Sequence, residues 1–322
     1  MNGDQITVLI SGAGTATCQS VIKGLRKQTS YKLLRIITYD MNPENAGKFM
    51  SDEFCTVPAA SDPDFMKRIG NIVRECKVDA VIPIVDWEFR KLSESREDFL
   101  KTLGCRIVIS SPETVDICDD KLMMNRFLTG IGIHTPKVFS AGEAAKLSVP
   151  FIVKPQINGR GSIDVYKTRS REELAFYLKK IQNPLITECL EGEEFTIDLM
   201  FDFNSRPVAG LVRKRIETKG GLAYKAEVVL DDGALKEAYK IGEALRVIGP
   251  ANMQFIKTAS GNYFFDLNPR FSGALACTIG AGLNTPLLLL HILKQREIPP
   301  EDLNYKLVRM YRYWNEFFSQ PD

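Results

Sequence analysis

The segment YFFDLNPRFSG (263–273) places three polar side chains two residues apart: Asp266, Asn268 and Arg270. Apolar and aromatic residues precede them, which is typical of a buried strand that ends here. Because strand side chains alternate between two faces, Asp266 and Asn268 are expected to share a face. A carboxylate and an amide oxygen suit Mg²⁺, which takes hard oxygen ligands from protein, phosphate and water. Arg270 can hold a further phosphate oxygen, although Asp, Asn and Pro are also common in ordinary turns.

The segment FIVKPQINGRGS (151–162) delivers a lysine from an apolar strand into a glycine-rich loop. The backbone N–H groups around Gly159, Gly161 and Ser162 can fold over phosphates while Lys154 neutralises their charge. An ordinary hairpin with a solvated lysine is the alternative. That alternative does not explain why Lys154 lies within an apolar strand.

The segment LITECLEGEEF (185–195) is an apolar strand that runs into an acidic connector containing Glu188, Glu193 and Glu194. Main-chain groups in such a connector can contact a base, and a carboxylate can bind ribose hydroxyls. Acidic turns are more often simply solvated, so this segment alone is a weak indication.

The segment SGAGTATC (11–18) follows a strand and opens a helix, with Gly12 and Gly14 allowing a tight turn at the helix N-terminus. Asp40 ends the next strand, where a dinucleotide-binding fold carries its ribose-binding acid. However, Thr17 occupies the third glycine position and the spacing to Asp40 is long. The pattern therefore favours a structural turn or a substrate-side loop over a dinucleotide site.

The composition is that of an ordinary globular protein. The 322 residues carry 42 Lys and Arg against 40 Asp and Glu, and a net charge of +2 gives no argument for nucleic acid or a membrane surface. No secretory signal and no apolar run of spanning length is evident, so we expect a cytoplasmic location. Seven cysteines without a CxxC pair indicate a reducing compartment. Only two histidines argue against a multi-histidine zinc site or a Ser-His-Asp hydrolase.

The order of expected elements divides the chain in two. The first third alternates apolar strands with helices, which predicts a parallel sheet covered on both faces. Its strands are expected at 6–11, 33–40, 54–58, 78–85 and 106–111, and its helices at 15–28 and 63–76, with a further helix between the last two strands. From about Pro112 the pattern becomes α+β with mostly antiparallel strands. These strands are expected at 149–155, 164–168, 185–190, 193–202, 207–217, 223–230, 251–258 and 262–268, with helices from Asp119 or Asp120 to Leu128 and at 170–181, 233–248 and 284–294.

Taken in order, these motifs resemble the ATP-grasp superfamily. The arm that the chain resembles includes the carbamoyl phosphate synthase large subunit, biotin carboxylase and D-alanine ligase. The resemblance is carried by DDKLMMNRFLTGIGIHTPK, PFIVKPQINGRGS, ITECLEGEEF and ANMQFI…YFFDLNPRFSG, and it covers about residues 1–295. It implies a Rossmann-like domain over 1–112, a small ATP-grasp subdomain with a glycine-rich flap over 113–187, and a large subdomain with the metal site over 188–322.

The resemblance also implies roles for individual residues. Lys121 and Lys154 would contact the ATP phosphates under a flap that includes Gly159, Gly161 and Ser162. Glu188 and Leu190 would form the adenine hinge, and Glu194 would bind ribose, with Glu191 as a competitor. Asp266, Asn268 and Gln254 would hold Mg²⁺ or Mn²⁺, and Arg270 and Lys154 would act in catalysis. In the family's E-x-N-P-R motif Glu is commoner than Asp at the first position, so that bridging of two metals by Asp266 is in question.

The implied activity is that of an ATP-dependent carboxylate–amine ligase: a carboxylate attacks the γ-phosphate, and an amine displaces phosphate from the acylphosphate. Arg213 and Arg215, which share a strand face opposite Lys214, would bind the acid or would be solvated. The expected partners are small carboxylate and amine substrates, and a homodimer is compatible with the sequence. Two rivals remain: a nucleotide-dependent dehydrogenase that uses the Gly12/Gly14 turn, and a non-catalytic ATP-binding regulator.

Overall fold

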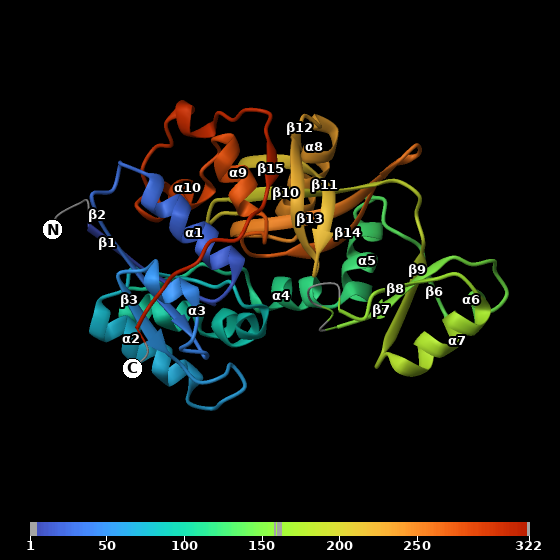
Figure 1. The fold of residues 1–322 in the computed structure, drawn as a ribbon, viewed down its shortest axis with the longest axis horizontal. Helices are drawn as coiled ribbons and strands as arrows, with labels where there is room; N and C mark the ends of the chain where they lie inside the picture. Colours follow the sequence, from blue (N-terminus) through green and yellow to red (C-terminus); the bar gives the residue numbers. More distant parts are fainter. Residues whose placement is uncertain (1–4, 158, 160–162, 321–322) are drawn as a thin grey trace.

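The computed structural model describes residues 5–157, 159 and 163–320. Its N-terminal domain is a parallel sheet of five strands in the order β3-β2-β1-β4-β5 (Figure 1). The strands are β1 (Gln5–Ser11), β2 (Leu33–Asp40), β3 (Glu53–Thr56), β4 (Ala80–Ile82) and β5 (Arg106–Ile107). Buried side chains on both faces of β1 agree with the predicted doubly covered sheet.

Helices pack on both faces of this sheet. Helix α2 (Phe65–Cys76) and helix α3 (Phe89–Leu103) cover one face, and helix α1 (Ala16–Lys27) covers the other. The side chain of Thr15 caps α1 by accepting a hydrogen bond from the backbone N–H of Cys18. Short 3₁₀ turns, η1 (Ala46–Phe49) and η2 (Asp86–Glu88), follow β2 and β4. Both β4 and β5 are shorter than the strands that the sequence predicted at 78–85 and 106–111.

Two helices lead from the first domain to the rest of the chain. Helix α4 (Pro112–Asp119) was not predicted, although Ser111 at its N-cap and Pro112 at its first position are standard start signals. Helix α5 (Lys121–Gly130) begins where predicted, since the Asp120 carboxylate accepts hydrogen bonds from the backbone N–H groups of Leu122 and Met123. Lys121 is therefore fixed at a capped helix start.

A small antiparallel sheet lies at the far end of the molecule from the N-terminal domain (Figure 1). Its strand order is β6-β9-β7-β8. The elements are β6 (Val138–Phe139), α6 (Ala141–Ala144), β7 (Phe151–Pro155), β8 (Tyr166–Thr168), α7 (Arg171–Lys180) and β9 (Pro184–Glu188). Phe151, Val153, Leu174 and Ile186 form its separate small core, so the sheet and its helices pack as a unit.

A larger antiparallel sheet of six strands, β14-β13-β10-β11-β12-β15, occupies the middle of the molecule. Its strands are β10 (Glu193–Phe201), β11 (Pro207–Lys219), β12 (Leu222–Val229), β13 (Gly249–Thr258), β14 (Gly261–Asn268) and β15 (Arg309–Tyr311). Helix α8 (Asp232–Ala244) and helix α5 pack on one face. Helix α9 (Leu275–Ala281) and helix α10 (Thr285–Leu293) pack between this sheet and α1, so the large sheet and the N-terminal domain share one core.

The C-terminal segment adds to the fold beyond the predicted elements. Helix α9, the 3₁₀ turn η3 (Pro300–Leu303) and strand β15 were missed, because short elements of three to seven residues carry little periodic signal. After β15 the chain runs back over the N-terminal domain (Figure 1), where Phe317 stacks on Phe49. Among the described residues no single helix is long and apolar enough to cross a membrane, although α9 and α10, bent by 87°, pass that test as a pair.

Candidate active site

A cavity of about 570 Å³ opens where the N-terminal domain, the small sheet and the large sheet meet. It contains every described residue that the sequence placed in the site: Lys121, Lys154, Gly159, Glu188, Leu190, Glu194, Gln254, Asp266, Asn268 and Arg270. These segments, distant in the sequence, therefore meet at one cavity, and the roles of their residues in binding stay predictions. Gly161 and Ser162, also predicted for the site, lie outside the described residues.

One end of the cavity is formed by the paired strands β13 and β14. Gln254 lies on the partner strand, as predicted, and the strand register places it directly opposite Asp266. Asn268 lies two residues further on the same face, and its side-chain amide donates a 2.9 Å hydrogen bond to Oδ2 of Asp266. One carboxylate flanked by two amides is a donor set that suits Mg²⁺ when phosphate and water complete its shell. These three residues thus fit the metal site implied by the resemblance.

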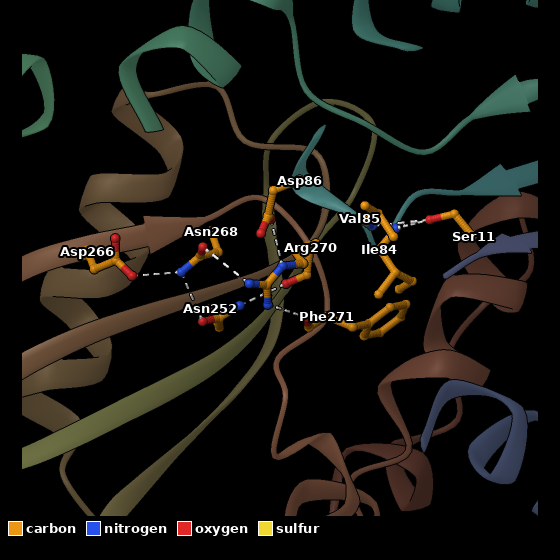
Figure 2. A network of polar contacts seen from close by, with 9 residues as sticks. All are labelled: Ser11, Ile84, Val85, Asp86, Asn252, Asp266, Asn268, Arg270 and Phe271. Atoms are coloured by element: carbon orange, nitrogen blue, oxygen red, sulfur yellow. Dashed lines mark hydrogen bonds and ion pairs between the residues drawn. The ribbon is translucent and has the colours of Figure 1, made fainter. Parts of the chain in front are cut away.

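Arg270 connects this end of the cavity to the N-terminal domain (Figure 2). Its Nε donates a 2.9 Å hydrogen bond to Oδ1 of Asp86, and its Nη2 lies 3.4 Å from Oδ1 of Asn268. Its Nη1 donates to the carbonyl of Phe271, and Asn252 donates to the carbonyl of Arg270. The guanidinium is therefore fixed in orientation beside the proposed metal ligands.

Asp86 is a site residue that the sequence reading missed. It follows strand β4, and ligands of open parallel sheets bind outside the carboxyl ends of their strands, so position alone could have indicated it. The buried hydroxyl of Ser11 accepts hydrogen bonds from the backbone N–H groups of Ile84 and Val85, at 2.6 and 3.2 Å (Figure 2). These two hydrogen bonds to Ser11, at the end of β1, fix the turn that places Asp86 beside Arg270.

Lys154 is a buried cation on strand β7, only 8% exposed. Desolvation and, to a lesser extent, the nearby charge of Lys121 lower the pKa of Lys154 to about 8, while Asp266 acts in the opposite direction. Its ammonium group lies 5.5 Å from the centre of the Phe265 ring, and no hydrogen bond or ion pair joins it to another described residue. Lys121 donates a 3.2 Å hydrogen bond to the carbonyl of Gly159. Lys121 and Lys154 thus place two positive charges close together at one wall of the cavity.

The acidic connector between β9 and β10 lies at the opposite wall. Glu188 donates its backbone N–H to the carbonyl of Lys137, at 2.8 Å, which leaves Cys189 and Leu190 at the cavity surface. Glu194 lines the cavity and forms an ion pair of 3.1 Å with Nε of Arg215. Glu193, which is exposed, lies on the other face of β10 and pairs with Lys214. Of the two neighbouring acids, Glu194 is the one directed to the cavity.

The face of strand β11 that carries Arg213 and Arg215 is directed to the cavity, and Lys214 faces away. Strand alternation predicted this arrangement, but not the burial of Arg213, which is fully inaccessible to solvent. Its Nη2 is bonded to Asp198 at 2.6 Å and to Ser272 at 3.0 Å. The alternative that both arginines are solvated is therefore wrong.

The Gly12–Gly14 turn is structural. Oδ2 of Asp40 accepts a hydrogen bond from the backbone N–H of Gly14, and its Oδ1 accepts one from Asn42, both at 3.0 Å. Both oxygens of the acid that would bind ribose are thus engaged by the protein's own backbone. Gly47 packs so closely that an added Cβ would lie 2.0 Å from the carbonyl oxygen of Ala13, so that η1 covers the turn. The dehydrogenase alternative is not favoured.

Two segments of the chain match family models. Residues 180–312 match the family described as "ATP-grasp in the biosynthetic pathway with Ter operon", and residues 8–108 match the "PylC-like, N-terminal domain". The chain therefore contains a PylC-like N-terminal domain and an ATP-grasp domain.

Known proteins of this kind are distant in sequence. The carbamoyl phosphate synthase large chain of Clostridium botulinum is 28% identical over 198 residues, covering 54% of this chain and 18% of that protein. D-alanine–D-alanine ligase of Fusobacterium nucleatum is 25% identical over 190 residues, covering 52% and 62%. The structure of N5-carboxyaminoimidazole synthetase from Staphylococcus aureus complexed with ADP superposes with a TM-score of 0.72 at 15% identity, covering 96% of this chain and 81% of that one. At that identity the likeness establishes the fold.

Proposed function

We propose that this protein is an ATP-dependent ligase that activates a carboxylate as an acylphosphate and transfers the acyl group to an amine. The observation that carries the proposal is the meeting, in one cavity, of two lysines with Asp266, Asn268 and Arg270. These residues come from the small sheet, the helix start at α5 and the end of β14. A dehydrogenase would not need this set, and a non-catalytic nucleotide sensor would not need Arg270 held beside the metal ligands.

ATP would occupy the cavity between the small and large sheets. The main chain at Glu188 and Leu190 would contact adenine, and Glu194 would exchange its ion pair with Arg215 for ribose hydroxyls. Lys121, Lys154 and the backbone at Gly159 would bind the phosphates, since they supply positive charge and N–H groups at low exposure. On this proposal the subdomain boundaries are 1–112, 113–187 and 188–322.

Asp266, Asn268 and Gln254 would hold Mg²⁺, with Mn²⁺ as the alternative ion. The ion, when bound, offsets the charge that develops on the phosphate oxygens. A single carboxylate in the donor set favours one protein-bound ion over two bridged by the same side chain.

The reaction needs orientation and charge neutralisation more than acid–base groups. A carboxylate oxygen attacks the γ-phosphorus and ADP leaves; the amine nitrogen then attacks the acyl carbon, and phosphate leaves as the nitrogen loses a proton. Arg270 and Lys154 would stabilise negative charge on the transferring group, and the fixed guanidinium requires no reorganisation during the step. Exclusion of water from the cavity protects the acylphosphate from hydrolysis.

The test is an ADP-release screen with Mg-ATP and a matrix of carboxylic acids and amines. An acid-dependent burst of ADP that becomes sustained only when an amine is added supports the proposal. Calorimetry of a non-hydrolysable ATP analogue with magnesium, repeated on Lys154→Ala, examines binding separately from turnover. Equal nucleotide affinity in the two proteins would argue against the proposed site.

A further inference from the structure

Buried arginine nitrogens without a hydrogen-bond partner lie at and beside one side of the cavity. Arg213 and Arg215 line the cavity, and Arg312 contacts Gly273, which also lines it. Five buried side-chain nitrogen or oxygen atoms lack a hydrogen-bond partner among the described residues, and four of them belong to three arginines. They are Nε and Nη1 of Arg213, Nε of Arg312, and Nε of Arg215, the last of which forms an ion pair of 3.1 Å with Glu194. A buried N–H without a partner is costly, and a cluster of them indicates a ligand that accepts hydrogen bonds.

Arg213 is the best fixed of the three. Its Nη2 is bonded to Asp198 and to the hydroxyl of Ser272, and Asp198 also accepts a hydrogen bond from Thr278. These contacts hold one side of the guanidinium, while Nε and Nη1 remain unpartnered in a residue that lines the cavity. The arrangement is that of a preorganised anion donor, because the planar group cannot turn without breaking the bonds to Asp198 and Ser272.

Arg312 brings a second positive charge from the C-terminal segment. Its Nη2 donates a 2.8 Å hydrogen bond to the carbonyl of Gly273, the residue after Ser272. Burial, and then the charge of Arg213, lower the pKa of Arg312, as expected for two guanidinium groups that lie near each other. Asp198 and Glu194 pair with Arg213 and Arg215, but no described carboxylate forms an ion pair with Arg312. The cluster therefore has an excess of positive charge.

We propose that Arg213, Arg312 and Ser272 form a subsite for a second oxyanion of the acid substrate. The substrate is then a dicarboxylic acid or a phosphorylated carboxylic acid. This inference rests on the proposed ligase function, in which the reacting carboxylate meets the γ-phosphate beside Arg270 and Asn268. Ser272 and Gly273 lie two and three residues beyond Arg270, so that the subsite would hold the far end of a short acid whose near end reacts.

The experiment measures binding of matched acids to the full chain with a non-hydrolysable ATP analogue and magnesium present. Succinate is compared with butyrate, and phosphoglycolate with glycolate, by calorimetry. The expected result is that at least one dianion binds about tenfold to hundredfold more tightly than its matched monoacid, as for a charge-assisted hydrogen-bonded contact. The pair that shows the preference identifies the second group as carboxylate or phosphate. Equal affinities within both pairs overturn the subsite.

Variants test which residues cause the tighter binding of the dianions. Arg312→Gln should reduce the dianion preference at least about tenfold while nucleotide affinity is retained. The matched control is Arg309→Gln, because Arg309 begins strand β15, three residues before Arg312, but pairs with Glu227. The dianion preference of this variant should equal that of the wild type. If Arg312→Gln fails to fold, the dianion preference is measured in Ser272→Ala instead, which removes only a hydroxyl and should also reduce the preference. An unchanged preference in folded Arg312→Gln overturns the assignment.

The same titrations separate the two proposals. Nucleotide affinity is measured first, and absence of magnesium-dependent nucleotide binding counts against the ligase function itself. Normal nucleotide binding without dianion preference counts only against the subsite.

Discussion

Asp86 and Arg270, which are 184 positions apart in the sequence, are joined by a 2.9 Å hydrogen bond between Oδ1 and Nε. The two side chains are only about one-fifth exposed, at 20% and 19%. The contact links the end of a strand in the N-terminal domain to the end of the strand that carries Asp266 and Asn268. The N-terminal domain thus determines the orientation of the arginine that we propose acts on the transferring phosphoryl group.

Asp86→Asn should lower kcat/KM for the acid substrate about tenfold, because the amide keeps the size of the side chain but loses the charge that aligns Arg270. Nucleotide affinity should stay near the wild-type value. The measurement is steady-state ADP release in a double-mutant cycle with Arg270→Lys. Strictly additive effects of the two changes would show that the contact does not serve the reaction.

Asp266→Asn and Asn268→Ala should each reduce acid-dependent ADP formation at least about hundredfold, since the metal supplies several kcal/mol of charge stabilisation in phosphoryl transfer. Both residues lie at the end of β14, so the sheet should survive and the thermal melt should change little. Asn262→Ala is the matched control, because Asn262 lies on the same strand and its amide binds Glu237. Near-normal turnover in Asp266→Asn would contradict the proposed metal site and would show that these residues only form a turn at the end of the strand.

The sequence was sufficient to predict the segments that carry long apolar runs or strict alternation. The β13–β14 hairpin was predicted, and a period of two fixed that Asp266 and Asn268 share a face. The register that places Gln254 opposite Asp266 is a finding of the structure. The parallel first sheet followed from strand–helix alternation. The roles of the cavity residues in ATP and metal binding stay predictions until they are measured.

What the sequence could not predict depends on contacts between distant segments. No local sequence pattern distinguishes Asp86 as a site residue. It is recognised as one only from its hydrogen bond with Arg270 in the folded structure. The buried guanidinium of Arg213 is bonded to Asp198 and Ser272, which no local pattern connects to it. Helix α4 is different, because its start is encoded locally by Ser111 at the N-cap and Pro112 at the first helical position.

Gly47→Ala should destabilise the protein by about 1–3 kcal/mol, as expected for overpacking against backbone. The added Cβ would lie 2.0 Å from the carbonyl oxygen of Ala13, and neither backbone segment can move without disturbing the Gly12–Gly14 turn. The free energy of unfolding from urea titration checks this. Gly142→Ala is the control, since Gly142 lies in helix α6 with no atom within 4 Å of the added Cβ, and it should be neutral or slightly stabilising. Equal effects of the two changes would contradict the close packing over this turn.

Lys154 should make both stability and nucleotide binding depend on pH. Its pKa falls from 10.5 to about 8 on folding. The unfolded chain therefore binds more protons between these values, and stability should rise with pH across that interval. Below pH 8 the buried charge has its full cost, roughly 3 kcal/mol at most. Lys154→Met should thus raise the melting temperature at pH 7 while abolishing ADP formation.

The negative charge of bound ATP should restore the protonated form of Lys154, because an anion nearby raises the pKa of an ammonium group. Nucleotide binding should consequently take up a proton above pH 8, and affinity should fall as the pH increases from 7 to 9.5. Calorimetry in buffers of different ionisation enthalpy measures both quantities. Lys154→Met, in which residual binding should be independent of pH over this range, is the control. A flat affinity profile in the wild type, without proton uptake, would show that Lys154 does not face the phosphates.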